Sequence, residues 1–112
     1  MKREPRLFVE DILQSITKIE EYTKNLKQEE FFHDSLAQDA VLRRFEIMGE
    51  AVKNLPEDFR LNHPDVPWRQ IAGLRDVLIH GYFGVNLGRV WLAIEKDLPD
   101  LKTRIIDVLK EM

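Results

Sequence analysis

The C-terminal quarter of the chain carries a long apolar seam, and this seam restricts the possible fold more than any other feature. Its residues lie alternately four and three positions apart without a break: Leu87, Trp91, Ile94, Leu98, Leu101, Ile105, Val108 and Met112. That spacing places the side chains on one face of an α-helix. Pro99 interrupts the helical hydrogen bonding, so we expect a kink near Glu95. The sequence therefore predicts one long bent helix, or two nearly collinear helices.

Two upstream stretches have the same helical spacing. Apolar residues three to four positions apart predict a first helix over roughly residues 6–27. Residues 28–34 are mostly polar and are predicted to form a loop. Ser35 followed by Gln38 fits a capping box, which predicts that a second helix begins at Ser35. Its apolar stripe is Val41, Phe45, Met48, Val52 and Leu55.

Prolines and a glycine delimit the central part of the chain. Pro56 could open a short helical turn that extends through Phe59. Pro67 suits the first turn of a third helix, and Gly81 is a natural residue just beyond its end. With no repeat or linker, the 112 residues are expected to form one domain. The predicted fold is all-α, an antiparallel bundle of four to five helices whose last helix is kinked at Pro99.

Residue usage excludes several classes of chemistry. The chain has no cysteine, so disulfides, thiolate catalysis and cysteine-ligated zinc are excluded. His33, His63 and His80 are scattered without helical ligand spacing, so neither a metal nor another cofactor is expected. No apolar run approaches the ~20 residues of a membrane span, and the N-terminus lacks the features of a secretory signal. We therefore expect a cytoplasmic protein.

The charge balance limits how the chain could meet a nucleic acid. The formal net charge is −3, so any RNA contact must come from a local basic patch. Candidates for a basic rim are Arg43, Arg44, Lys53, Arg69 and Arg89. Residues of this kind are more often ordinary surface charge.

The segment from Pro67 to Leu87 holds the best candidates for chemistry. Arg75, His80 and Tyr82 bring together a permanent cation, a base that titrates near neutrality and a phenol. Metal-independent RNA cleavage needs a base for the ribose 2′-OH and a cation for the phosphate, and histidine and arginine suit these roles. By spacing alone the pair is also compatible with chance, and with a histidine that caps the carbonyls at the end of a helix.

Three stretches carry a resemblance to a known family: FEIMGEAVKNLP, PWRQIAGLRDVLIHGYFGV and WLAIEKDLPDLK. They resemble the HepT family, small proteins of the HEPN superfamily that are usually encoded beside a minimal nucleotidyltransferase of the MntA type. The resemblance extends from residue 11 to the last helix. It includes the family's motif of Arg, four residues, His, one residue and Tyr.

The resemblance implies a helical homodimer that acts as a metal-independent endoribonuclease, the toxin of a type VII-like toxin–antitoxin pair. Arg75 and His80 match the catalytic pair, which meets its copy from the second chain in one cleft. Tyr82 matches the tyrosine that the MntA-type antitoxin adenylylates from ATP to silence the toxin. Asp76 lies at a position where the family varies among polar residues, and it is assigned a supporting role.

Two readings from other classes stay open. The chain could be a catalytically silent helical subunit that binds and positions a nucleotidyltransferase. It could also be a structural bundle that dimerises through the seam ending at Met112. A pure scaffold has no need for a base beside a cation, so the intact motif favours the enzyme.

Overall fold

The computed structural model describes residues 3–79 and 86–112 and, of residues 75–79, the backbone alone. The described elements are helical, and no strand occurs among them. They are α1 (Pro5–Thr23), α2 (Gln28–Phe32), α3 (Ser35–Asn54), α4 (Glu57–Leu61), α5 (Trp68–Ile79), α6 (Leu87–Leu92), the π-helical η1 (Ala93–Asp97) and α7 (Leu98–Glu111). The prediction of an all-α fold is confirmed.

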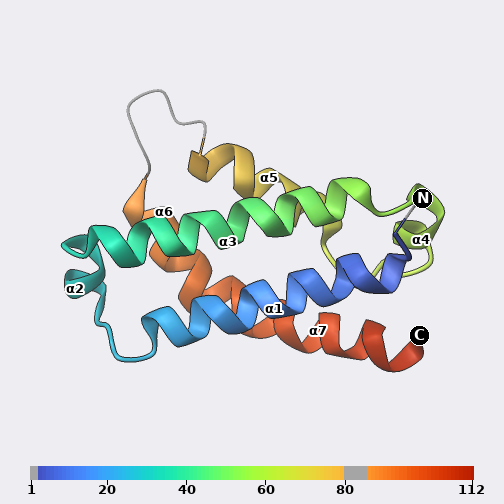
Figure 1. Ribbon diagram of the computed structural model, residues 1–112, viewed down its shortest axis with the longest axis horizontal. Helices are drawn as coiled ribbons and strands as arrows, with labels where there is room; N and C mark the ends of the chain where they lie inside the picture. Colours follow the sequence, from blue (N-terminus) through green and yellow to red (C-terminus); the bar gives the residue numbers. More distant parts are fainter. Residues whose placement is uncertain (1–2, 80–85) are drawn as a thin grey trace.

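The long elements form an antiparallel bundle (Figure 1). α1 runs in one direction, α3 returns beside it, α5 reverses again, and the run from α6 to α7 completes the bundle against α1. The short helices α2 and α4 lie at opposite ends of α3, and both chain termini lie at the end that holds α4. This arrangement agrees with the four-to-five-helix bundle that the apolar spacing predicts.

A continuous cluster of buried apolar side chains joins the elements. It contains the predicted stripe of the second helix and most of the C-terminal seam, whose last member, Met112, is exposed. Its largest fully buried members are Phe31, Phe45, Ile12, Ile16, Ile19, Met48, Leu98 and Ile105. Fully burying one such side chain contributes about 1.5–3 kcal/mol, so the cluster is the main stabilising feature of the bundle.

The predicted start of the first helix, near residue 6, is confirmed, but its predicted end and the predicted loop after it are wrong. α1 ends at Thr23, whose hydroxyl donates to the carbonyl of Ile19 at 2.8 Å, and residues 28–32 form the short helix α2. α2 is stabilised at its start because the Glu30 carboxylate accepts from the N–H of Lys27 at 2.9 Å. Phe31 then fills the core, with its ring centroid 5.3 Å from that of Trp91. Tertiary packing thus stabilises α2, a helix that the mostly polar sequence of this segment does not predict.

The start of the second helix is predicted correctly, but its cap is not. The N-cap of α3 is Asp34, whose Oδ1 accepts from the N–H of Ala37 at 3.0 Å. Gln38 does not complete a capping box, because its side chain donates to the carbonyl of Phe31 at 2.9 Å. The polar residue before the helix therefore outcompetes Ser35, and Gln38 ties α3 to α2.

The bend expected at Pro99 takes the form of a π-helical turn. In η1 the N–H of Leu98 donates to the carbonyl of Ala93, five residues back, immediately before Pro99 enters α7. In a regular α-helix Pro99 could not donate a hydrogen bond to the carbonyl of Glu95, and its ring would clash with that carbonyl. The π-helical turn adds one residue just before Pro99 and so shifts the hydrogen-bond register at this point. The run from Leu87 to Glu111 stays continuous and changes direction between α6 and α7 (Figure 1). One long bent helix, the first of the two predicted alternatives, is confirmed.

Across the described ranges, no helix has both the length and the apolar character that crossing a bilayer requires.

Candidate active site

The predicted site residues are distributed over α5 and the segment that follows it. The backbone of Arg75 and Asp76 belongs to α5, whose described part ends at Ile79. His80 and Tyr82 lie outside the described residues, as does the predicted helix-ending Gly81. The structure thus places the arginine of the motif on a helix, and the catalytic assignment itself stays a prediction.

α5 is anchored firmly at its first turns. Trp68, Ile71 and Leu74 are buried in the core, as the apolar spacing predicts. The carbonyl of Pro67 accepts from the N–H of Ile71 at 3.0 Å, so Pro67 lies at the N-cap, just before the first turn. The indole Nε1 of Trp68 donates to the carbonyl of His63 at 3.0 Å. These contacts fix the helical register that carries the backbone of Arg75.

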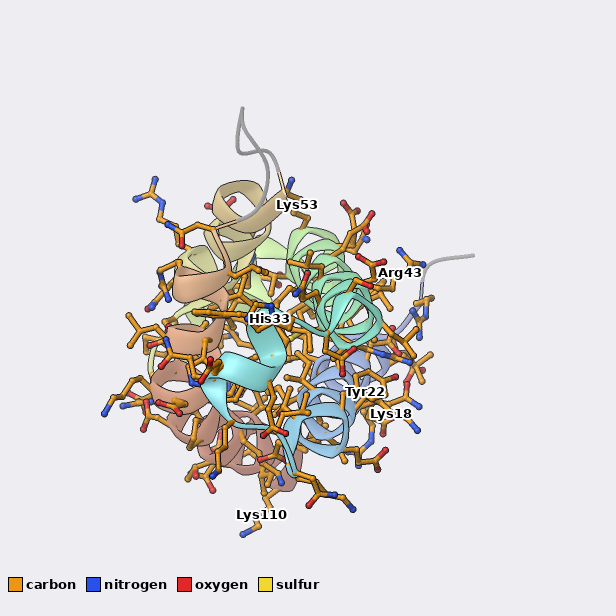
Figure 2. All side chains as sticks on the ribbon, turned by 90° about the vertical axis from the view of Figure 1, so that its left-hand side faces the viewer. Lys18, Tyr22, His33, Arg43, Lys53 and Lys110 are labelled. Carbon is orange, nitrogen blue, oxygen red and sulfur yellow. The ribbon has the colours of Figure 1, made fainter. Side chains whose placement is uncertain are left out.

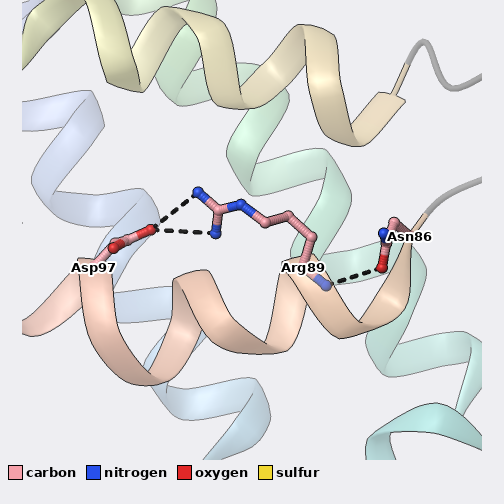
Figure 3. Close-up of polar contacts among 3 residues, drawn as sticks. All are labelled: Asn86, Arg89 and Asp97. Atoms are coloured by element: carbon pink, nitrogen blue, oxygen red, sulfur yellow. Dashed lines mark hydrogen bonds and ion pairs between the residues drawn. The ribbon is translucent and has the colours of Figure 1, made fainter.

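α6, the helix that begins after the undescribed segment, is also anchored at its start. Asn86 caps α6, because its Oδ1 accepts from the N–H of Arg89 at 3.0 Å (Figure 3). Val90 and Trp91 follow at once and are buried. Trp91 also donates from Nε1 to the Glu95 carboxylate at 2.8 Å. The segment that carries His80 and Tyr82 therefore joins α5, which is anchored through its first turns, to α6, which is anchored at its start.

Arg89, a member of the predicted basic rim, is held by an internal carboxylate. Both terminal nitrogens of its guanidinium lie 3.3 Å from Oδ2 of Asp97 (Figure 3). Eight positions separate the two residues, which would misalign them on a regular α-helix. The extra residue of η1 restores the alignment, since it gives the pair the phase of positions seven apart. Sequence spacing could not show this ion pair, because the π-helical turn creates it.

Two further candidates for a basic rim, Arg43 and Lys53, project from α3 in different directions (Figure 2). In the view along the long axis of the bundle, Lys53 points upward and Arg43 points to the right (Figure 2). Arg43 is also 3.5 Å from the Glu46 carboxylate, one helical turn away. Ordinary surface charge therefore describes Arg43, and Arg89 is already paired with Asp97.

Two hollows lie away from the α5–α6 junction, at the end of the bundle that holds α4. One, of about 450 Å³, is bordered by His63 and by the last turns of α7. His63 Nδ1 lies 3.5 Å from Glu111 there, and the neighbouring Arg104 donates to the carbonyl of Asp65 at 2.7 Å. The hydrogen bond that Arg104 donates to the Asp100 carboxylate, together with the negative charge of Asp100, raises the pKa of Arg104. In the part of the chain that the structure describes, no three histidine or carboxylate side chains converge as metal ligands.

Comparison with known proteins identifies the family of the chain. The profile of the family described as "Ribonuclease HepT-like" matches residues 12–108. The chain belongs to this family.

Relatives of this HepT-like chain occur in archaea and bacteria. A protein of Thermococcus cleftensis, provisionally named ribonuclease HepT, is 47% identical over 91% of the chain and 93% of its own length. A protein of Caldanaerobacter subterraneus subsp. tengcongensis, provisionally named an RNase, is 45% identical over 96% of both chains. The third, from Methanocaldococcus jannaschii, is named as both a gamma-glutamylcyclotransferase and, provisionally, an RNase. It is 46% identical over the whole chain, which spans only 50% of that relative's length. No solved structure matches the chain.

Proposed function

We propose that this HepT-like chain is a metal-independent RNA endonuclease, the toxin of a type VII-like toxin–antitoxin pair that acts in the cytoplasm as a single HEPN domain. The observation that carries the proposal is the Arg75, His80 and Tyr82 motif inside the segment that matches the family. The anchored helices on either side of the motif support it, because a catalytic constellation needs a rigid support.

In the proposed reaction the RNA supplies its own nucleophile. His80 accepts the proton of a ribose 2′-OH, and the 2′-oxygen forms a bond to the adjacent phosphorus. The bond from phosphorus to the 5′-oxygen breaks, and the leaving oxygen takes up a proton. Arg75 holds the phosphate oxygens and stabilises the negative charge that gathers on them in the transition state. Asp76 supports the site, and no step needs a metal or another cofactor.

The site is proposed to be complete only in a homodimer. One chain offers one motif, whereas two-fold pairing places two histidines and two arginines around one cleft. The monomer carries a net charge of −3, and pairing would concentrate positive charge where the RNA phosphate binds.

Tyr82 is proposed to be the control point. An MntA-type nucleotidyltransferase would transfer an adenylyl group from ATP to its phenol and release pyrophosphate. The attached phosphodiester carries one negative charge, which would pair with Arg75 and occupy the position of the substrate phosphate. Silencing would then be local and would need no change of fold.

A cleavage assay in excess chelator tests the nuclease. Purified wild-type protein should cut RNA, and His80→Ala should lower the rate at least ~10²-fold, the usual effect of losing a general base. Arg75→Ala should cause a comparable loss, because the phosphate charge is then uncompensated. Arg43→Ala removes an equal charge from an exposed part of α3 and should leave the rate unchanged.

Full activity of the His80→Ala protein would refute the catalytic assignment. If the wild-type protein leaves RNA intact but binds the nucleotidyltransferase, the chain is instead the silent helical subunit considered above.

A further inference from the structure

The second hollow lies beside the first turn of α5, at the opposite end of this helix from the catalytic motif. Its volume is about 540 Å³, and it is bordered by α4, by the loop that follows and by the start of α5. Its walls are partly apolar, from Leu61, Pro64 and Pro67. Leu61 is 71% exposed, so its side chain is accessible to a ligand in the hollow.

Two arginines border the hollow without a counter-ion in the described part of the chain. Arg60 comes from α4 and Arg69 from the first turn of α5. The Nε of Arg60 is buried, and no group in the described ranges accepts a hydrogen bond from it. A buried donor without an acceptor is costly, so the side chain of Arg60 is not fully satisfied by the protein beside this hollow.

The charge of Arg69 is unfavourable at its position in the first turn of α5. A helix N-terminus carries partial positive charge, which favours acidic residues in the first turn and disfavours cations. α5 has no acidic residue in that turn and places Arg69 there instead. Among the residues that the structure describes, Glu57 is the one carboxylate that borders the hollow, against two guanidinium groups and the helix N-terminus. The net positive potential suits an anion.

We propose that this hollow binds a phosphate group of the RNA strand, upstream or downstream of the bond that is cut. Arg60 and Arg69 hold the phosphate oxygens, and the apolar wall from Leu61 to Pro67 accommodates the attached nucleoside. Arg69 and Ile79, the last described residue of α5, are 10 positions apart, about 15 Å at the rise of an α-helix, and His80 follows Ile79 in the sequence. A strand that reaches from the scissile phosphate along α5 would cover this distance in a few nucleotides. The inference rests on the proposed nuclease function and names a second contact of its substrate.

RNA binding without cleavage tests the hollow. A fluorescent single-stranded RNA oligonucleotide is titrated with the His80→Ala protein, and Arg69→Ala is added to that background. We expect the Kd to rise about tenfold, the usual effect of losing a charged hydrogen bond. The slope of log K against log salt should fall by about 0.7, the value of one single-strand phosphate contact. Arg60→Gln, which keeps a polar side chain at this half-buried position, should act in the same direction.

Arg43→Ala is the matched control, since it removes one exposed cation from α3 and Arg43 does not border the hollow. Equal weakening by Arg43→Ala and Arg69→Ala would mean that bulk charge governs binding and would overturn the proposal. Parallel titrations with AMP and inorganic phosphate identify the source of the phosphate. If Arg69→Ala weakens AMP binding and leaves RNA binding unchanged, the hollow takes a free nucleotide and the RNA assignment is wrong.

The nuclease assay separates this proposal from the function on which it rests. With His80 intact, Arg69→Ala should raise KM for a long RNA and leave kcat unchanged, because Arg69 touches no reacting atom. A wild-type protein that cuts RNA, with an Arg69→Ala variant of the same KM, would refute the hollow and leave the nuclease standing. A wild-type protein that cuts no RNA would refute the nuclease, whatever the binding titrations give.

Discussion

At the scale of single residues, Tyr82 separates catalysis from its control. Tyr82→Phe removes the hydroxyl that would be adenylylated but leaves the proposed base and cation in place. We expect the variant to cut RNA at the wild-type rate and to escape silencing by the nucleotidyltransferase and ATP. Mass spectrometry of the two proteins after that incubation should show the added adenylyl group on Tyr82 of the wild type alone. A group found on another residue, or a Phe variant that is still silenced, would contradict the assignment.

At the scale of elements, the start of α3 distinguishes two caps that the sequence alone presents as alternatives. Asp34→Ala removes the acceptor for the N–H of Ala37 and should lower the free energy of unfolding by about 1 kcal/mol. Ser35→Ala, one position later and exposed, should change it by less than about 0.5 kcal/mol. Urea denaturation followed by circular dichroism measures both. The reverse order of effects would restore the capping box that begins at Ser35.

At the scale of the whole molecule, the proposed cleft depends on association. We expect light scattering to report a particle of twice the 13.3 kDa chain mass at micromolar concentration. The physical reason is that a chain of net charge −3 offers one motif, and pairing supplies the second. Only monomer at these concentrations would count against the dimeric cleft. The Arg43→Ala protein is the control, because Arg43 is exposed on α3. We expect this variant to have the same particle mass in solution as the wild type.

The sequence by itself determined the class of fold and the position of most core residues. An unbroken spacing of three and four predicts helices because the period of the α-helix is local and strong. The buried stripe of α3, the burial of Trp68, Ile71 and Leu74, and the bend before Pro99 all follow from such local rules. The motif from Arg75 to Tyr82 and the family resemblance could also be recognised in the sequence, because both depend on residue identity and spacing.

Only the tertiary structure decided the features that depend on distant partners. α2 forms because Phe31 finds a place in the core beside Trp91, although its sequence is mostly polar. The ion pair between Arg89 and Asp97 needs the extra residue of a π-helical turn, which no α-helical spacing reveals. The hollow between Arg60 and Arg69 exists because the loop after α4 returns to the start of α5. Each of these features depends on packing or on backbone geometry, and the local helical period of the sequence does not predict either.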